Sequence, residues 1–228
     1  MKIDILSTGS HGNAILFCES VLLDAGVAYK HLKPYVSSIK AVLLTHIHGD
    51  HFNKSVIQQL CVANESIKFC CGEFLVDNLI DLGIPKKSIV TLKLGQRYKI
   101  DDISFWAVHL YHDAPNFGYR IHQGKHKHFH ATDTATLEGI TANNYDTATL
   151  ECNHEIVAAD KIMIDKANDG EFCHLRRAVA THLGVAKAID FVQVNSIKTL
   201  YPVHIGRSTK KEVFDALAES NINIKRGY

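Results

Sequence analysis

The stretch LLTHIHGDHFN, residues 43–53, places three histidines and one aspartate within six positions, directly after an apolar run. The four side chains are those of His46, His48, Asp50 and His51. Divalent metals such as zinc favour imidazole and carboxylate ligands. The first two histidines stand two residues apart, so an extended backbone directs both to one side, and the glycine that follows them lets the chain fold back. We interpret this stretch as part of a metal site rather than as a polar loop with incidental histidines.

One loop with four ligands cannot complete two metal coordination spheres, so further ligands are expected downstream. Three candidates end or follow strand-like apolar runs: His112 in LYHDAP, Asp133 in HATDTA and His204 in YPVHIG. The end of a rigid strand can aim a side chain into a site. The sequence therefore predicts a metal centre assembled from four separate segments.

The order HxHxDH, then His, then Asp, then His resembles the metallo-β-lactamase fold superfamily over nearly the whole chain. The resemblance implies an α/β fold, a four-layer αββα sandwich of two mixed β-sheets flanked by helices, in a single domain spanning residues 1–228. It also implies two divalent metal ions, zinc in the first place and manganese as the alternative. Carried over, one ion is bound by His46, His48 and His112, the other by Asp50, His51 and His204, with Asp133 as the bridge.

Two neighbouring divalent ions lower the pKa of water and offset the charge that develops in hydrolysis. Asp50 is placed to orient or deprotonate the attacking water. The β-lactamases with two zinc ions carry a cysteine where this chain has Asp133, so the resemblance disfavours antibiotic hydrolysis. Asp24, at the end of the strand-like run VLLD, is expected to support the ligands by hydrogen bonding.

The strings STGSHGN, LLDAG, PNFGYRI, ATDT, LECNHE and THLG, in this order, resemble the YycJ-like (WalJ) branch of the superfamily. That branch resembles exonucleases acting on DNA and is akin to tRNA 3′-processing and ribonuclease J enzymes. The resemblance implies a phosphodiesterase, foremost a nuclease. The chain departs from the branch by having Thr181 and Gly184 where a glycine and a serine are usual, and by the residues that follow its last ligand histidine.

A phosphodiesterase must protonate or otherwise stabilise the leaving oxygen. His182 matches a histidine that phosphodiesterases of this fold use near the scissile phosphate, and we expect it to act as the general acid. Glu151 is the catalytic candidate that would orient it. The alternative for His182 is a solvated residue at the start of a helix.

Three further residues are candidates for substrate binding: Ser10 and Asn13 in the glycine turn SHGN, and His154, close to Glu151 in the sequence. A glycine turn can offer backbone donors to a phosphate. The alternative for SHGN is a tight strand connection.

The composition bounds the function. At 228 residues and 46% hydrophobic content, the chain supplies a sizeable core. Its 25 lysines and arginines against 24 acidic residues argue against a protein wrapped along DNA. A compact phosphodiesterase that degrades cyclic nucleotide signals, as phage enzymes with this fold do, is therefore an alternative. A thioester or lactone hydrolase on the same metals is a further one. A non-enzymatic member of the fold is disfavoured by the full ligand set.

The N-terminal residues MKIDILSTGSHGN lack the apolar segment of a signal peptide, and no apolar run approaches the length of a membrane span. The six cysteines form no CxxC pair and are expected to be reduced, mostly buried thiols. We therefore expect a cytoplasmic enzyme, with a nucleic acid or nucleotide as its partner and no membrane association. The sequence leaves homodimerisation open.

Alternating and apolar runs predict strands, among them KIDILS, AILFC, VLLDAG, AVLLT, ISFWAVHLY and FGYRIHQG. Helices are predicted over residues 53–63, with Asn53 as N-cap, over 72–83, near 174–194, and over 208–220 with a serine cap. In HQGKHKHFHATD, alternation places His126, His128 and His130 opposite the face of Asp133. We expect these three at the surface or between elements rather than as ligands.

Overall fold

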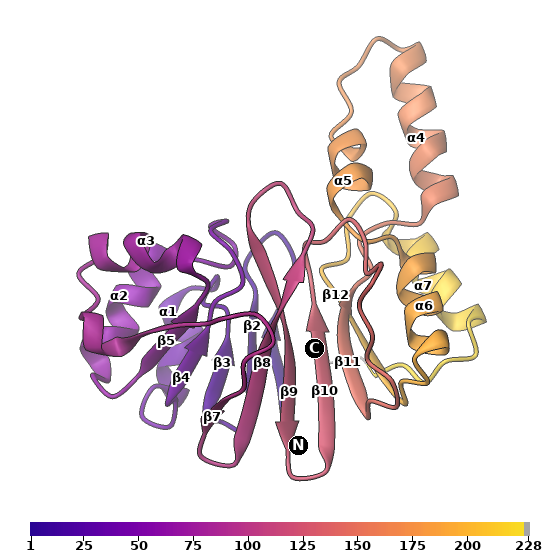
Figure 1. Cartoon of the computed structure of the whole chain (residues 1–228). Helices are drawn as coiled ribbons and strands as arrows, with labels where there is room; N and C mark the ends of the chain where they lie inside the picture. The colour runs from indigo at the N-terminus through magenta and orange to yellow at the C-terminus, as the bar shows by residue number, and fades with distance from the viewer. Residues whose placement is uncertain (226–228) are drawn as a thin grey trace. The chain divides into compact units, whose positions relative to one another are not determined.

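The computed structural model describes residues 1–225, which fall into two compact units (Figure 1). The N-terminal unit comprises residues 1–109 and 114–126, and the C-terminal unit comprises residues 110–113 and 127–225. The prediction of one domain over residues 1–228 stays a prediction.

The N-terminal unit contains a six-stranded mixed sheet with the order β1-β2-β3-β4-β5-β6. The first three strands pair in antiparallel fashion, and β3 to β6 run parallel. The strands are β1 (Ile3–Ser7), β2 (Ala14–Phe17), β3 (Val21–Leu23), β4 (Ala41–Leu43), β5 (Lys68–Cys71) and β6 (Ile89–Thr91). Strands β2, β3 and β4 are buried throughout, which explains their nearly continuous apolar sequences.

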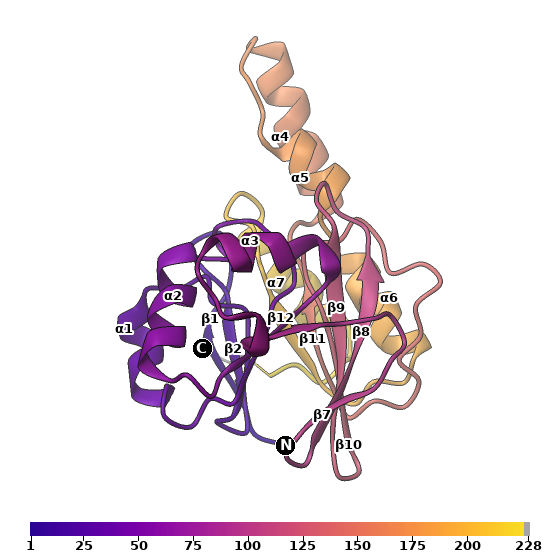
Figure 2. The ribbon, with the colours of Figure 1, turned by 60° about the vertical axis from the view of Figure 1, so that its left-hand side comes forward.

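Helices α1 (Tyr29–Leu32), α2 (Lys54–Ala63) and α3 (Val76–Asp81) lie on one side of this sheet (Figure 2). The side chain of Asn53 accepts a hydrogen bond from the backbone N–H of Val56, which confirms the predicted cap of α2. Helix α2 then buries its apolar stripe in the same core as Leu22, Val42 and Phe69. This packing holds the β4–α2 connection, which carries the His/Asp stretch, between two buried elements.

The second six-stranded sheet has the order β12-β11-β10-β9-β8-β7. Its strands are β7 (Tyr98–Ile100), β8 (Ile103–Leu110), β9 (Asn116–Gln123), β10 (His126–Ala131), β11 (Thr147–Glu151) and β12 (Leu200–Val203). Strands β10, β11 and β12 are parallel neighbours in the C-terminal unit, whereas β7 and β8 are antiparallel. The carboxyl ends of β10, β11 and β12 therefore meet at one edge, where open α/β sheets bind their ligands.

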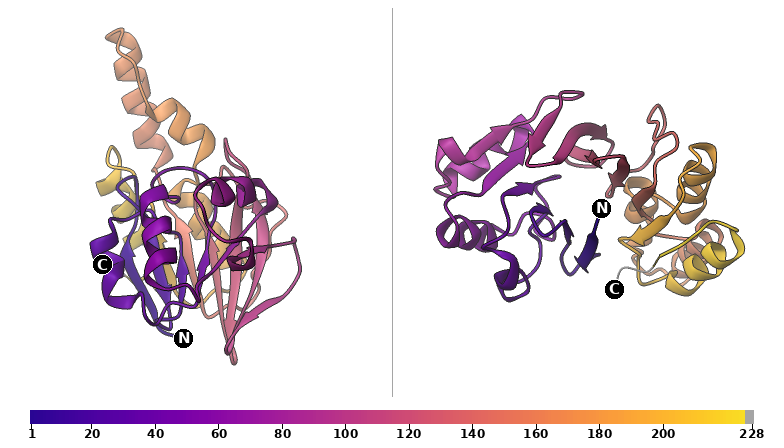
Figure 3. Two further views of the ribbon diagram at one scale, coloured as in Figure 1. Left: turned by 90° about the vertical axis from the view of Figure 1, so that its left-hand side faces the viewer. Right: turned by 90° about the horizontal axis from the view of Figure 1, so that it is seen from below.

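The C-terminal unit carries α4 (Ile156–Asn168), α5 (Leu175–Thr181), α6 (Val185–Val194) and α7 (Lys210–Glu219). Helix α6 packs against α7 and β11 (Figure 3). Helices α4 and α5 form a hairpin that extends beyond the ends of β11 and β12 (Figure 1).

Helix α4 is absent from the sequence prediction. Its cap is the side chain of Glu155, outside the usual set of Ser, Thr, Asp and Asn, and within the helix only Ala159 is buried. Val157 and Ile164 are exposed, so the helix shows no buried apolar stripe that the sequence could reveal. The expected serine cap of α7 is also wrong, because Thr209 holds the N-cap position.

Two of the β10 histidines, which were expected at the surface or between elements, lie between elements. His128 and His130 are buried, because β10 has both faces covered at its carboxyl end. Both rings bond to the Oγ1 atom of Thr149 on β11, at 3.0 Å and 2.7 Å. The alternative of a position between elements therefore describes them correctly.

Among residues 1–225, no helix is long and apolar enough to cross a lipid bilayer.

Candidate functional site

Three candidate site residues stand one or two positions beyond strand ends in a left-handed backbone conformation. Asp24 follows β3 with φ 58°, Asp133 follows β10 with φ 55°, and His204 follows β12 with φ 52°. Residues other than glycine adopt this conformation uncommonly, and it costs of order 1–3 kcal/mol when the surroundings impose it. The strand ends in both units are therefore shaped to aim particular side chains.

In the N-terminal unit, Asp24 is the buried centre of a hydrogen-bond network. Its carboxylate accepts from the backbone N–H of Thr45 at 2.9 Å and lies 2.6 Å from Nδ1 of His51. Burial raises the pKa of Asp24, and the contacts with His51 and Thr45 oppose that rise. We infer that the carboxylate of Asp24 accepts a hydrogen bond from Nδ1–H of His51, which leaves Nε2 as the unprotonated nitrogen.

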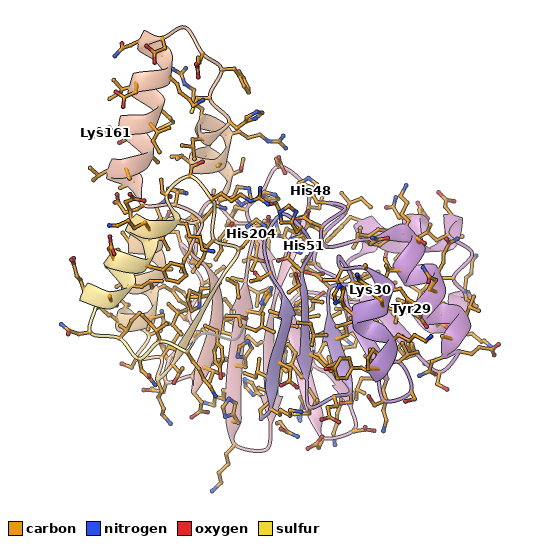
Figure 4. The ribbon with its side chains drawn as sticks, turned by 180° about the vertical axis from the view of Figure 1, so that it is seen from behind. Tyr29, Lys30, His48, His51, Lys161 and His204 are labelled. Atoms are coloured by element: carbon orange, nitrogen blue, oxygen red, sulfur yellow. The ribbon has the colours of Figure 1, made fainter. Side chains whose placement is uncertain are left out.

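The hydroxyl of Thr45 fixes the tautomer of His46 in the same way. Its single hydrogen serves the carboxylate of Asp24, 2.9 Å from Oδ2, so its oxygen accepts from Nδ1 of His46 at 2.9 Å. The ring of His46 also lies 4.7 Å from that of His48 and 4.3 Å from that of His51, between ring centroids. The structure thus gathers the three histidines of the predicted motif, and His48 and His51 are labelled in Figure 4.

Asp50 completes this N-terminal cluster. Its Oδ2 lies 3.6 Å from Nε2 of His51. The amide of Asn13 lies 2.8 Å from the same Nε2 and donates to the backbone oxygen of Asp50 at 3.1 Å. Ser10, the other candidate of the SHGN turn, is exposed.

The glycine that this loop requires is Gly26, which the sequence did not single out. A Cβ atom on Gly26 would lie 1.7 Å from the backbone oxygen of Asp50. Gly49, expected to let the chain fold back, lies outside the left-handed region, and a Cβ there would meet nothing within 4 Å. The expectation for Gly49 is therefore wrong, because the constraint is a close approach between backbones rather than a special φ.

In the C-terminal unit, Glu151 ends β11 and is fully buried. Its Oε1 lies 2.6 Å from Nδ1 of His182 and 2.9 Å from Nδ1 of His204, and its Oε2 accepts from the N–H groups of Thr134 and Leu183 at 3.2 Å and 3.0 Å. Burial alone would raise the pKa of Glu151, but the hydrogen bonds from both histidines hold that pKa below its usual value. Glu151 therefore acts as an ionised acceptor.

Asp133 lies beside this pair of histidines. Its Oδ1 is 3.5 Å from Nε2 of His204 and 3.9 Å from Nε2 of His112. One ligand atom each from Asp133, Glu151, His182 and His204 can be chosen so that all four lie within 4.8 Å of one another. The predicted residues of this unit therefore converge, at the strand ends near the labelled His204 of Figure 4.

His112 is held in the tautomer that metal binding requires. Its Nδ1 lies 3.0 Å from the backbone oxygen of Thr181, and because a carbonyl only accepts, Nδ1 carries the hydrogen and Nε2 does not. Burial lowers the pKa of His112, which favours the neutral ring. Metal-binding histidines commonly donate their second N–H to a protein acceptor in this way.

The same arrangement recurs in four candidate ligands, in which Nδ1 faces a protein oxygen; they are His46, His51, His112 and His204. Neutral imidazoles with an unprotonated Nε2, next to carboxylates, form a donor set that suits divalent metals such as zinc. Each unit, taken by itself, therefore contains histidines whose tautomers suit metal binding.

His182 is the C-cap residue of α5 rather than a residue at the start of a helix. Burial lowers the pKa of His182, but the hydrogen bond to Glu151 and the negative charges of Glu151 and Asp133 together raise that pKa more, so the net shift is upward. His154 is buried and pairs with Gly184 in an isolated bridge, and burial lowers the pKa of its ring. The orienting contact predicted between Glu151 and His182 is therefore present in the structure.

The model of the Beta-lactamase superfamily domain family matches residues 19–205, most of the chain. The chain belongs to this family. Among solved structures, the metallo-β-lactamase fold protein YhfI from Bacillus subtilis superposes with a TM-score of 0.75 at 16% identity, covering 99% of this chain and 96% of that one. The short form of human tRNase Z superposes with a TM-score of 0.69, also at 16% identity, with the same coverage.

A curated relative from Salmonella heidelberg (strain SL476), named probable L-ascorbate-6-phosphate lactonase UlaG, is 33% identical over 81 residues. The match spans 34% of this chain and only 22% of the relative. The predicted α/β fold of two mixed sheets flanked by helices is confirmed. Membership of the β-lactamase superfamily and the His/Asp clusters indicate a metal-dependent hydrolase.

Proposed function

We propose that this β-lactamase superfamily protein is a dinuclear-metal-dependent phosphodiesterase, foremost a nuclease of the YycJ-like type. The observation that carries the proposal is the contact of 2.6 Å between His182 and the buried carboxylate of Glu151, beside Asp133. This pair offers a proton donor next to candidate metal ligands. Cleavage of a phosphodiester needs such a donor for its leaving oxygen.

The proposed ligands are those of the sequence prediction, with His46, His48 and His112 for one ion and Asp50, His51 and His204 for the other, bridged by Asp133. The tautomers of the four histidines with Nδ1 bound to protein oxygens support this assignment. When bound, two zinc or manganese ions would acidify water and offset negative charge on the phosphoryl oxygens.

The chain's own residues carry the proton transfers. The carboxylate of Asp50 orients the attacking water and accepts its proton. Glu151 fixes the ring of His182 through Nδ1, so that Nε2 delivers the proton to the departing oxygen. Ser10, Asn13 and His154 are proposed to contact the substrate; Asn13 is the one whose amide lies against the ligand pair Asp50 and His51.

The proposed substrate is a nucleic acid or nucleotide. The likeness to tRNase Z supports a phosphodiester, and the near balance of 25 basic and 24 acidic residues favours a short or small one. The alternatives are a phosphodiesterase for cyclic nucleotide signals, and a lactone or thioester hydrolase. The name of the curated lactonase supports the lactone hydrolase.

The test is hydrolysis of two substrates in parallel by Mn²⁺- or Zn²⁺-loaded protein: 5′-phosphorylated DNA and a panel of 3′,5′-cyclic nucleotides. His182→Ala and Asp50→Ala serve as inactive controls. Cleavage of DNA supports the nuclease, and turnover of cyclic nucleotides alone supports the signal-degrading enzyme. Metal-loaded protein that cleaves neither contradicts the phosphodiesterase.

A further inference from the structure

We propose that Arg177 is a specificity-determining residue that recognises the anionic phosphoryl group of the substrate. The inference rests on the proposed function and deepens it, because a phosphodiester carries a negative charge that a lactone or thioester group lacks. Arg177 belongs to α5, and its Nη2 donates to Oδ2 of Asp113.

The ion pair lies directly beside a candidate ligand. Oδ1 of Asp113 is 3.2 Å from Nε2 of His112, so a single carboxylate group separates the guanidinium of Arg177 from that nitrogen. A phosphoryl group held by an ion on His112 would therefore approach to within reach of the arginine.

Helix α5 holds this arrangement in register. Arg177 and Thr181 stand one helical turn apart, and Oγ1 of Thr181 donates to the backbone oxygen of Arg177 at 2.9 Å. The backbone oxygen of Thr181 accepts from Nδ1 of His112, while Arg177 binds the next residue, Asp113. The two residues thus contact consecutive positions of the same loop, which orients that face of α5 toward the site.

Arg177 keeps the capacity to bind an anion. A guanidinium has five N–H donors in a planar fork that matches a phosphate, and the side chain of Arg177 is 75% exposed. The carboxylate of Asp113 lies beside the ligand His112 and is not one of the proposed metal ligands, so its negative charge would repel an approaching phosphodiester. A cation at this position offsets that repulsion, and Asp113 competes with the substrate for it.

Because Asp113 and the substrate compete for Arg177, the two variants that break this ion pair are expected to change phosphate affinity in opposite directions. Arg177→Met and Asp113→Asn both break the ion pair. Arg177→Met removes the guanidinium that would bind the phosphate, whereas Asp113→Asn frees that guanidinium to bind it. We measure KM for bis(p-nitrophenyl) phosphate at saturating metal, and the affinity of the metal-loaded protein for inorganic phosphate by calorimetry. Arg176→Met, on the exposed neighbour in the same helix, is the matched control.

Arg177→Met is expected to raise KM and weaken phosphate binding about tenfold, in the range of a charged hydrogen bond. Asp113→Asn is expected to shift both in the opposite direction, by about threefold, and Arg176→Met to leave both unchanged. Turnover of neutral p-nitrophenyl acetate should be insensitive to Arg177→Met. Shifts of both variants in the same direction, or no shift, would overturn the inference.

The two measurements separate this inference from the proposed function. Wild-type protein that hydrolyses no phosphodiester, but shows opposite shifts in phosphate affinity, contradicts the phosphodiesterase and supports the arginine. Wild-type protein that hydrolyses the phosphodiester without opposite shifts supports the phosphodiesterase and overturns the arginine.

Discussion

Oδ2 of Asp24 lies 2.6 Å from Nδ1 of His51, and both side chains are buried. The aspartate is 27 residues away from the histidine in sequence and is not itself one of the proposed ligands. By fixing the tautomer of His51, it determines which nitrogen is offered to a metal. The candidate metal site therefore depends both on the ligands and on the residues that orient them.

We expect Asp24→Asn to weaken metal binding by about 10- to 100-fold, because an amide cannot accept from Thr45 and His51 together as the carboxylate does. Titration of the protein with Zn²⁺ against a competing chelator measures the change. Asp81→Asn, at an exposed position of the same unit, is the control. An Asp24→Asn protein that binds zinc as tightly as the control would contradict this role.

We expect Gly26→Ala to lower the free energy of unfolding by about 2 kcal/mol or more and to impair metal binding. The new methyl group would occupy the space of the backbone oxygen of Asp50, 1.7 Å away, so the His/Asp loop must move. Gly49→Ala, three residues after His46, is the matched control, because its Cβ meets nothing within 4 Å. Urea unfolding measures the free energy of unfolding of both variants, and equal values for the two would refute the prediction.

We expect Glu151→Gln to lower kcat by about 10²- to 10³-fold and to change KM little, because His182 loses its ionised partner. The variant should also be less stable by about 1–3 kcal/mol, since its NH₂ group must face N–H donors that the carboxylate now satisfies. Steady-state kinetics and urea unfolding give the two values. Glu138→Gln, at an exposed position, should change neither; full activity of Glu151→Gln would exclude an orienting role.

The buried thiols predict how stability depends on alkaline pH. Burial raises the pKa of Cys70 to about 12 and that of Cys71 to about 12, against 9.0 for an ordinary thiol. Between pH 9 and about pH 12 the folded protein keeps the thiol protons that the unfolded chain has lost. The free energy of unfolding therefore falls as the pH rises above 9, by about 1.4 kcal/mol per pH unit for each thiol.

Replacement of one thiol tests this linkage. From pH 8.5 to 10.5, Cys70→Ala should lose about 2 kcal/mol less of its unfolding free energy than the wild type. Urea unfolding at the two pH values provides the comparison. Parallel losses in both proteins would show that Cys70 does not carry the predicted shift.

The sequence predicted the parts of the site in which the chemistry lies in the residue types themselves. The spacing of His46, His48, Asp50 and His51 after a buried strand needs no tertiary information, and neither does the N-cap Asn53. Strands were found where alternation or an unbroken apolar run marks them, as in β1 and β4.

The residues that the sequence missed act through contacts between distant segments. Gly26 matters because another backbone lies against it, and Thr45 and Arg177 matter because of a carboxylate elsewhere in the chain. Helix α4 escaped prediction because its apolar residues are exposed. For His128 and His130 the sequence left open a position at the surface or between elements, because period-2 alternation does not show whether the second face of a strand is covered.

The most direct test of the central claim is hydrolysis of bis(p-nitrophenyl) phosphate by the metal-loaded protein, compared with a thioester and a lactone at equal concentration. We predict turnover of the phosphodiester that requires added Mn²⁺ or Zn²⁺ and is lost in His182→Ala. Hydrolysis of the thioester or the lactone, with none of the phosphodiester, would contradict the account.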